Sequence, residues 1–497
     1  MGIVKKQVYK NTMVSYAGMV IAYINTILLF PFFITNEQYG LYNLLINMSV
    51  LYSLVASFGI PGVIAKYFPF YRTADRKHNG FIHWTAGLSL LGFVVLTGLF
   101  VLLRPVILPA YIKNSPLFVK YYYYLIPLAF FTVVFNYLEV TGRIIYKTIF
   151  SSFLRDVLVR LITTVLLVMM ALKWLNFDGF IVLYIASWGV ISALLMISLF
   201  ISGEFSHRLD DLKFSSIKKS EALNYGLFTF ISVAIYVFLQ KVDVVMLSSM
   251  AGDAIQGVYS WYFNIAVVIS VPAQALSRTT YQIVADSWKS KDMQNIAGVY
   301  RKTSIIQMVI GCLLFVGIII NKNNLLGIVH DPEKSAQFNV IIIIGLGFLV
   351  DITGGLNTYI VTTSHKYKLV TLFILFASVF SIGLNYLLIP HYKGMGAAIA
   401  YLVTMILLNF CTWFYIKYRF KMQPFDHKHL LIILISVASF FAGKYFWLMP
   451  NLYLDIAVRS SITALVYIII TYYCHISDDL NEKIDSILRK VKVLWNK

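Results

Sequence analysis

Three basic residues lie well inside long apolar stretches of this 497-residue chain. Arg155, Lys241 and Arg278 have no good acidic partner on the same helical face, and a charge in hydrocarbon is costly unless it is paired or hydrated. Fixed cations around a wet cavity attract an anionic group, so these three are candidates for lining a binding cavity. The alternative is pairing with a carboxylate on another helix, for which Asp243 or Asp351 could serve.

Asp351 is the most isolated acidic residue of the apolar stretches. It is followed by Gly354 and Gly355, where a helix can loosen. A carboxylate at such a place could bind H⁺ or Na⁺, and Asp243 is a second candidate for the same role. An interhelical hydrogen bond or salt bridge is the alternative. No metal site and no organic cofactor is predicted.

Other charged residues in these stretches have a partner four residues away. A spacing of four stacks opposite charges on one helical face, which predicts intrahelical ion pairs. The pairs are Glu139 with Arg143, Asp156 with Arg160, and Asp455 with Arg459. Arg143, together with Lys66, is nevertheless kept in the set of candidate cavity cations.

Several kinds of chemistry have no basis in the sequence. It contains no phosphate-binding loop of the GxxxxGK[ST] type and no HExxH pair, so neither ATP hydrolysis nor zinc-dependent hydrolysis is indicated. The three cysteines, Cys312, Cys411 and Cys474, fall inside or at the edge of apolar stretches without metal-ligand spacing. They are predicted to be small buried apolar residues.

The composition requires a membrane as solvent. Hydrophobic residues make up 59% of the chain, charged residues only 13%, and the mean hydropathy is +0.76. The net charge of +19 is spread over many short loops, which argues for membrane topology rather than nucleic-acid binding.

Stretches of about 20 apolar residues, the length needed to cross a bilayer, recur along the whole chain. We predict about fourteen spans, and the first is too long for a signal peptide. Their approximate ranges are 12–34, 40–64, 81–103, 118–138, 149–172, 179–201, 222–248, 255–284, 303–320, 338–363, 367–388, 395–416, 430–448 and 455–474. Prolines within four of them predict kinks, at Pro31, Pro61, Pro127 and Pro272.

Lys and Arg residues gather in alternate loops, on the same side as the N-terminus. This bias predicts that these loops and both termini are cytoplasmic. A weak internal repeat relates residues 38–42 (QYGLY) to residues 255–259 (IQGVY). Because six spans separate the two copies, the repeat is parallel.

The repeat predicts a domain organisation of two six-helix halves with additions at the C-terminal end. The tail places apolar residues on one helical face and basic residues elsewhere, as in helices that lie on a membrane surface. The expected parts are a half at 1–202, a cytoplasmic linker at 203–221, a half at 222–416, an extra helix pair at 417–475 and an amphipathic tail at 476–497.

Short motifs in both halves resemble one family. Residues 36–42 (NEQYGLY), 57–62 (SFGIPG) and 66–69 (KYFP) look like the first helical pair of the polysaccharide-export branch of the multidrug/oligosaccharidyl-lipid/polysaccharide (MOP) exporter superfamily. Residues 241–247 (KVDVVML) and 390–398 (PHYKGMGAA) resemble its second half.

The resemblance implies an all-α membrane fold like that of MATE transporters, and a flippase of the bacterial inner membrane. Its expected substrate is an undecaprenyl-pyrophosphate-linked oligosaccharide for capsule, O-antigen or exopolysaccharide assembly. The expected partners are this lipid-linked substrate, membrane lipids and polysaccharide polymerase machinery. The candidate cations would bind the pyrophosphate, Asp351 or Asp243 would bind the coupling ion, and the extra helix pair could hold the lipid tail.

Two other functions remain open. A cation-coupled multidrug exporter of the MATE type should favour carboxylates in its cavity, whereas the excess charge within these spans is basic. A membrane-embedded glycan polymerase or ligase typically needs a sizeable outer loop with catalytic groups. The longest outer loop, residues 321–337, is too poor in such groups to support this enzyme class.

Overall fold

The computed structural model describes residues 2–73, 78–145, 148–201, 219–366, 368–446 and 449–495. Within these ranges the secondary structure is helical, and no residue belongs to a strand. Eleven helices of the described residues are long and apolar enough to cross a membrane, or twelve if one bent pair counts as a span. The predicted all-α membrane fold is therefore confirmed.

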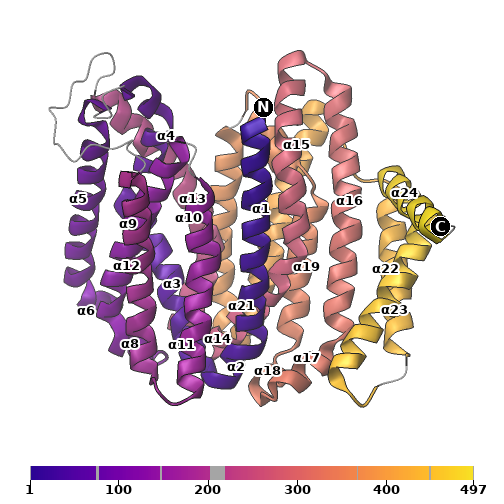
Figure 1. Cartoon of the computed structure of the whole chain (residues 1–497), viewed down its shortest axis with the longest axis horizontal. Coiled ribbons are helices and arrows are strands. Elements are labelled where there is room, and N and C mark those ends of the chain that lie inside the picture. The colour runs from indigo at the N-terminus through magenta and orange to yellow at the C-terminus, as the bar shows by residue number, and fades with distance from the viewer. Residues whose placement is uncertain are drawn as a thin grey trace. The chain divides into compact units, whose positions relative to one another are not determined.

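The helices pack into two compact units, Met1–Trp261 and Tyr262–Lys497. Figure 1 shows the long, roughly parallel helices of each unit. The first unit contains α1 (Gly2–Tyr23), η1 (Ile24–Leu29), α2 (Phe30–Phe33), α3 (Asn36–Ser57), α4 (Ile60–Tyr71), η2 (His78–Gly80), α5 (Phe81–Leu102), α6 (Arg104–Ile107), α7 (Pro109–Ile112), α8 (Pro116–Tyr121), η3 (Tyr122–Tyr124), α9 (Leu125–Ile144), α10 (Thr148–Phe153), η4 (Leu154–Leu158), α11 (Val159–Ala171), α12 (Phe177–Ile201), α13 (Lys219–Ala251) and the first part of α14 (Asp253–Ala266).

The second unit begins within α14. Its elements are η5 (Val267–Ser270), α15 (Val271–Ser290), α16 (Met293–Ile320), α17 (Lys322–Val329), α18 (Pro332–Ala336), α19 (Asn339–Thr353), α20 (Asn357–Thr363), α21 (Lys368–Phe420), α22 (His427–Lys444), α23 (Leu452–Tyr473) and α24 (Asp478–Trp495). Helices α22 and α23 pack against each other and against α16, and α24 lies tilted near one end of this pair (Figure 1).

Local sequence explains where several helices begin. Thr35 and Gln38 form a capping box at the start of α3, and α3 ends at Phe58 and Gly59, both with positive φ. Pro61 then occupies the first turn of α4, where its missing N–H costs nothing. Pro31 and Pro272 likewise lie in the first turns of α2 and α15. The predicted kinks at these prolines are thus starts of new helical segments.

Two predicted spans fall within the 53-residue helix α21. At 1.5 Å per residue this helix would be about 80 Å long, far more than the roughly 30 Å of a hydrocarbon core. Lys393 breaks it with φ 52 and ψ −126, directly before Gly394. The predicted fifth span is the succession α10, η4 and α11, whose middle is a π-helical turn. The count of fourteen spans stays a prediction.

Gly40 and Gly257 occupy equivalent positions in the two copies of the sequence repeat, and they lie against each other in the first unit. A Cβ on Gly257 would come within 2.9 Å of the backbone nitrogen of Gly40, and one on Gly40 would come within 2.8 Å of Gln256 Oε1. The two motifs therefore form one close backbone contact between the starts of α3 and α14.

The predicted division into sequence halves differs from the division into compact units, because α13 packs against α3 and α4 within the first unit. The linker predicted at 203–221 lies almost entirely outside the described residues. The predicted halves and the extra helix pair stay predictions, as does the membrane-surface role of the tail.

Candidate functional site

A cluster of charged side chains lies between α9 and η4 in the first unit. Both carboxylate oxygens of Glu139 accept hydrogen bonds from Arg155 Nη1, at 2.6 and 2.7 Å. Arg155 Nε also donates to Asp156 Oδ1 at 3.0 Å, and Asp156 Oδ2 accepts a hydrogen bond from Ser15 Oγ on α1. Arg143 lies 3.5 Å from Glu139. The cluster is a continuous network of opposite charges.

Arg155 shows the alternative that the sequence left open, pairing with a carboxylate on another helix, but its partner is Glu139 and not Asp243 or Asp351. Its long side chain reaches a carboxylate on another helix and also turns back to its neighbour Asp156. The predicted ion pair of Glu139 and Arg143 is confirmed. Its distance of 3.5 Å is longer than the 2.6 Å between Glu139 and Arg155. Within the described residues Asp156 pairs with Arg155 and makes no ion pair with Arg160. Arg155 thus carries no uncompensated charge.

Lys241 and Asp243 lie two residues apart on α13, so their side chains leave the helix in different directions. Asp243 is buried, and its carboxylate accepts hydrogen bonds from the Tyr259 hydroxyl and, at 2.9 Å, from the Val244 N–H. Among the described side chains Lys241 has no carboxylate within ion-pair distance. Lys241 is thus a candidate cation of the first unit without an ion pair among the described residues.

The two other candidate cations have different surroundings. Lys66 is exposed on α4, and its ammonium lies 3.9 Å from the ring centroid of Tyr225 and 4.8 Å from that of Tyr67. Such contacts leave the charge available to an anion. Arg278 lies on α15, but its side chain is outside the described residues.

Asp351 lies on α19, close to the bend of 44° between α19 and α20 in the second unit. Gly355, in the bend, has φ 63, so the helix does break at the glycine pair that the sequence marked. The carboxylate of Asp351 is exposed and accepts one long hydrogen bond, of 3.3 Å, from Asn409 on α21. Asn357 donates to Asn409 at 2.8 Å and to Thr412 at 3.0 Å. A nearly free carboxylate therefore adjoins a buried cluster of amide and hydroxyl oxygens.

Oxygen ligands of this kind suit a small hard cation. Among the described residues no group of three or more His, Cys, Asp and Glu side chains is placed to hold a metal ion.

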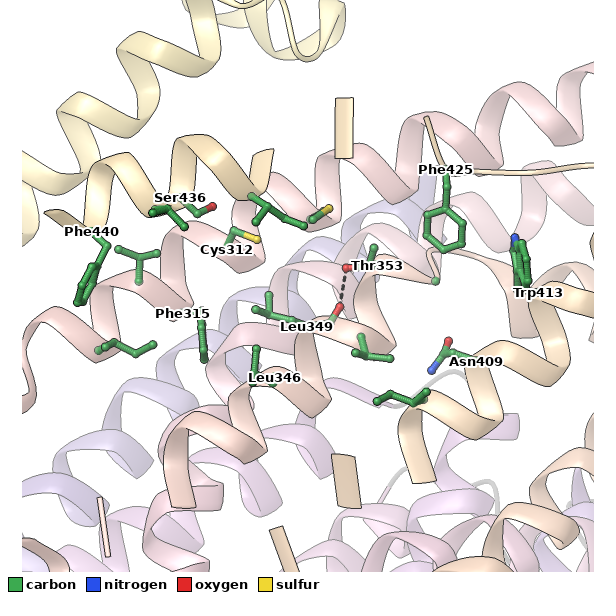
Figure 2. Close-up of a pocket in the computed structure, with 18 of the residues that line it drawn as sticks. Cys312, Phe315, Leu346, Leu349, Thr353, Asn409, Trp413, Phe425, Ser436 and Phe440 are labelled. Atoms are coloured by element: carbon green, nitrogen blue, oxygen red, sulfur yellow. Dashed lines mark hydrogen bonds between the residues drawn. The ribbon is translucent and has the colours of Figure 1, made fainter. Parts of the chain in front are cut away.

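An apolar cavity of about 810 Å³ lies between α16, α19, α21 and α22 in the second unit. Figure 2 shows the side chains around it, including Phe315, Leu349 and Phe440. Its polar lining is confined to a few side chains, chiefly Thr353, Asn409 and Ser436, and no charged side chain lines it. A cavity of this composition fits a hydrocarbon chain and not an ion.

Sequence reasoning did not locate this cavity. Its lining residues are spread from Met308 to Phe440, and nearly all of them belong to predicted spans, where their types do not distinguish them from neighbours that face lipid. The signal in the sequence was the predicted extra helix pair at 417–475, because α22 lies in this range and forms one wall of the cavity.

The fold defines the class of protein. The structure aligns with that of the lipid II flippase MurJ in an inward closed conformation, with a TM-score of 0.73, 14% identity, and coverage of 94% of this chain and 98% of that chain. It also aligns with an inward-facing multidrug resistance MATE family transporter of the MOP superfamily (TM-score 0.65, 13% identity, 83% and 98% coverage). The bent form of the Vibrio cholerae MATE transporter VcmN aligns with a TM-score of 0.54 at 12% identity, over 87% of this chain and all of that one. The chain has the fold of MOP superfamily transporters.

The sequence defines the family more closely. The family model for polysaccharide biosynthesis proteins matches residues 4–281, and the MatE family model matches residues 229–387. Comparison with curated protein sequences gives no match. The chain belongs to the polysaccharide biosynthesis protein family, and its multi-pass helical fold is that of MOP superfamily transporters. The predicted superfamily is therefore confirmed.

Proposed function

We propose that this protein is a flippase for undecaprenyl-pyrophosphate-linked oligosaccharides. It moves them from the cytoplasmic to the outer leaflet of the bacterial cytoplasmic membrane by alternating access, for capsule, O-antigen or exopolysaccharide assembly. The match to the polysaccharide biosynthesis family supports the substrate class. The observation that carries the proposal is the apolar cavity between α16, α19, α21 and α22.

The cavity supports a lipid-linked substrate because it is too apolar for a sugar. Phe315, Phe440 and Trp413 contribute to the lining, along with aliphatic side chains. A polyprenyl chain gains little hydrophobic free energy by leaving the bilayer, since lipid tails are as apolar as the cavity wall. What the cavity supplies is close packing around the chain, which holds the substrate in one place.

Uncompensated cations are the proposed contacts of the pyrophosphate. Among the described residues Lys241 has no ion pair, and Lys66 contacts the aromatic rings of Tyr67 and Tyr225. Both ammonium groups can therefore bind phosphate oxygens. Arg155 and Arg143 are weaker candidates, since Glu139 and Asp156 already compensate them. Arg278 stays in the proposed set.

Asp351 is the proposed binding site of a coupling ion, H⁺ or Na⁺. In the described part of the chain its carboxylate accepts one side-chain hydrogen bond, of 3.3 Å, from Asn409, and Asp351 lies next to the bend where α19 ends. Asp243 is the weaker candidate because Tyr259 and Val244 already satisfy its carboxylate.

The proposed orientation places both termini in the cytoplasm, as the distribution of Lys and Arg indicates. The outer leaflet is where polymerase machinery would receive the translocated oligosaccharide. A second candidate function, cation-coupled multidrug export, is favoured by the match of the MatE model to residues 229–387.

Transport in liposomes tests the proposal. Purified protein is reconstituted with a labelled polyprenyl-pyrophosphate oligosaccharide, and exposure of the label at the opposite leaflet is followed with and without a proton or Na⁺ gradient. We expect gradient-dependent exposure that is reduced in Lys241→Ala and Asp351→Asn. Movement of cationic dyes without exposure of the labelled lipid would instead establish the drug exporter.

A matched pair of variants tests the role of the cavity in transport. Ile433 and Leu434 are adjacent, exposed residues of α22, and only Ile433 lines the cavity. We expect Ile433→Trp to slow flipping of the polyprenyl-linked substrate and Leu434→Trp to leave it unchanged. Equal rates in the two variants would remove the cavity from the mechanism.

A further inference from the structure

Arg160 on α11 lacks a counter-charge in the part of the chain that the structure describes. The sequence predicted a pair with Asp156, but that carboxylate binds Arg155 through Oδ1 and accepts a hydrogen bond from Ser15 through Oδ2, both at 3.0 Å. The Arg160 guanidinium makes no ion pair and no hydrogen bond with any described residue, and the side chain is only partly exposed. Arg160 lies in the middle of the predicted fifth span, and the proposed transport cycle gives it no role.

The charges around Arg160 leave a positive excess. The local cluster consists of three arginines and two carboxylates, namely Arg143, Arg155, Arg160, Glu139 and Asp156. Asp156 attracts Arg160 from beyond ion-pair distance, whereas Arg155 repels it. An unpaired cation within a membrane span costs free energy, and an anion that enters reduces this cost.

Three tyrosines surround the Arg160 side chain and interact with it electrostatically. They are Tyr23 at the end of α1, Tyr42 on α3 and Tyr184 on α12. The rings of Tyr42 and Tyr184 pack edge to face, with centroids 4.9 Å apart. The Tyr23 hydroxyl oxygen is buried and has no hydrogen-bond partner among the described residues. Because a tyrosine hydroxyl can donate a hydrogen bond, Tyr23 offers a second contact to an anion bound by Arg160.

The backbone that carries Arg160 is held in place. Asn25 in η1 is 3% exposed, and its Nδ2 donates to the Arg160 carbonyl at 3.0 Å. Thr164 Oγ1 donates to Asn25 Oδ1 at 2.8 Å. The π-helical segment η1 contacts α11, and α1 contacts the second π-helical segment, η4. Such turns within helices often occur at functional sites. Arg160 thus combines a fixed backbone with an unengaged guanidinium, as suits a pre-positioned binding group.

We infer that Arg160 and the Tyr23 hydroxyl bind phosphate oxygens of the transported lipid pyrophosphate, an inference that rests on the proposed function. The planar guanidinium can donate to two phosphate oxygens at once, and the Tyr23 hydroxyl can donate to a third. Arg160 therefore joins Lys66 and Lys241 as a contact of the pyrophosphate. Unlike Arg155, it has no carboxylate to release before it binds the substrate.

Binding of two probes to the purified full-length protein tests the contact. The probes are geranylgeranyl pyrophosphate and geranylgeraniol, which share the isoprenoid chain and differ in the anionic group. We expect Arg160→Met to weaken binding of the pyrophosphate by about 10- to 100-fold and Tyr23→Phe by about fivefold, as for lost hydrogen bonds to a charged group and from a neutral one. Binding of the alcohol should not change in either variant. Equal losses for the two probes, or an unchanged affinity of Arg160→Met for the pyrophosphate, would overturn the inference.

Thermal unfolding without ligand separates a binding role from a structural one. Because Arg160 has no partner to lose, Arg160→Met should leave the melting temperature unchanged or raise it. Arg155→Met is the matched control, and it should lower the melting temperature because Glu139 and Asp156 lose their partner. Arg160→Lys keeps the charge without the planar fork, so it should bind the pyrophosphate with an affinity between those of the wild type and Arg160→Met. A lower melting temperature of Arg160→Met would show that Arg160 stabilises the fold, and it would refute the assignment.

The oligosaccharide flipping assay separates this inference from the proposed function. If the wild type does not flip the labelled oligosaccharide but binds the pyrophosphate through Arg160, the contact stands and the flippase role fails. If the wild type flips the oligosaccharide and Arg160→Met does so at the same rate with the same pyrophosphate affinity, the flippase role stands and the inference fails. A wild type that binds the pyrophosphate no more tightly than the alcohol would also refute the contact.

Discussion

Gly40 and Gly257, related by the internal repeat, are in direct backbone contact at the starts of α3 and α14. A Cβ on Gly257 would lie 2.9 Å from the Gly40 nitrogen and still closer to the Asn36 carbonyl oxygen. Because the obstructing atoms belong to the backbone, a small rotamer change cannot relieve the clash. The same residue type in both copies is therefore a requirement of this packing.

We predict that Gly40→Ala and Gly257→Ala each lower the free energy of unfolding by about 2 kcal/mol or more, as overpacked sites do. Thermal unfolding of the purified variants measures the effect. Gly98→Ala is the control, because a Cβ there meets open space. It should be neutral or slightly stabilising, since alanine favours helix more than glycine does. Wild-type stability in the first two variants would show that the two helices do not approach so closely.

The sequence predicted the helical fold well, because apolar length alone identifies a membrane helix. It was less successful where a span is interrupted. The break at Lys393 inside α21 falls between two predicted spans, whereas the π-helical turn at Leu154–Leu158 lies inside the predicted fifth span and was not predicted. The span count depends on such breaks, so hydropathy alone does not fix it.

The sequence predicted which residues carry charge within the spans. It did not predict which of these residues contact each other. Charges four residues apart were found from the sequence, as for Asp455 and Arg459. The contact between Arg155 and Glu139 joins residues on two helices, and its existence depends on how each helix is rotated about its axis. The apolar cavities were invisible for the same reason, since an apolar side chain that lines a cavity has the same type as one that faces lipid.

Ser304, His429 and Asp426 form a hydrogen-bonded series in the second unit that resembles the order of a hydrolase triad. His429 Nε2 lies 2.9 Å from Ser304 Oγ, and His429 Nδ1 lies 3.1 Å from Asp426 Oδ1. However, Ser304 donates its proton to the Thr353 carbonyl at 2.6 Å and is fully buried. His429 Nε2 must then be the donor, so it cannot act as a base toward Ser304. The series links α16, α19 and α22 structurally.

We therefore predict that Ser304→Ala destabilises the protein by about 1–3 kcal/mol, the cost of leaving buried polar groups unpaired. Thermal unfolding measures this loss. The control is Ser439→Ala on α22, where a fully buried hydroxyl already lacks a partner, so its removal should not destabilise. Equal effects of the two substitutions would show that the Ser304 contacts contribute nothing.

Asp426 lies before α22, and its carboxylate has a lowered pKa. Burial opposes ionisation, but hydrogen bonds from Arg301 and His429 outweigh it and hold the pKa below the usual value. Arg301 Nε donates to Asp426 Oδ2 at 2.8 Å. A depressed pKa in the folded state means that the ionised carboxylate stabilises the protein at every pH above the ordinary aspartate value of about 3.9. This stabilisation is lost as the pH falls through the lower folded-state pKa.

We predict that Asp426→Asn unfolds at a lower temperature than the wild type, by an amount that is constant between about pH 5 and 8 and shrinks below about pH 4. Asparagine keeps the N-cap function, so the difference reports the charge interactions. The expected loss at pH 7 is about 1 kcal/mol, because Arg301 is half-exposed and solvent weakens its contribution. A difference that grows on acidification would contradict this assignment.

The pair of Arg155 and Glu139 is suited to a double-mutant cycle. Arg155 is 40% exposed and Glu139 11% exposed, so their interaction is only partly screened. We predict that Arg155→Met and Glu139→Gln are each destabilising and that the double variant loses less than the two combined, with a coupling of about 1–2 kcal/mol. The exposed pair Lys302 and Asp479 is the control, with a coupling of at most about 0.5 kcal/mol. If the stability losses of the two single variants simply add, Arg155 and Glu139 do not stabilise each other. Arg155 would then be available to bind the substrate.

Arg459 and Asp455 form the most buried ion pair among the described residues, 4% and 2% exposed, within α23. Arg459 Nε donates to Asp455 at 2.9 Å, and its Nη1 donates to the Gly443 carbonyl of α22 at 2.8 Å. Removal of one partner leaves a buried charge uncompensated, which typically costs about 3–5 kcal/mol.

We predict that Arg459→Met loosens the packing of α22 against α23 and leaves the first unit intact. Hydrogen exchange followed by mass spectrometry should show faster exchange in α22 and α23, with unchanged rates in α3 and α9. The double variant Arg459→Met with Asp455→Asn removes both charges and should recover part of the protection, because no unpaired carboxylate then remains. If the single variant exchanges like the wild type, the ion pair does not hold the two helices together; if the double variant is no better than the single one, the Gly443 contact matters more than the charge.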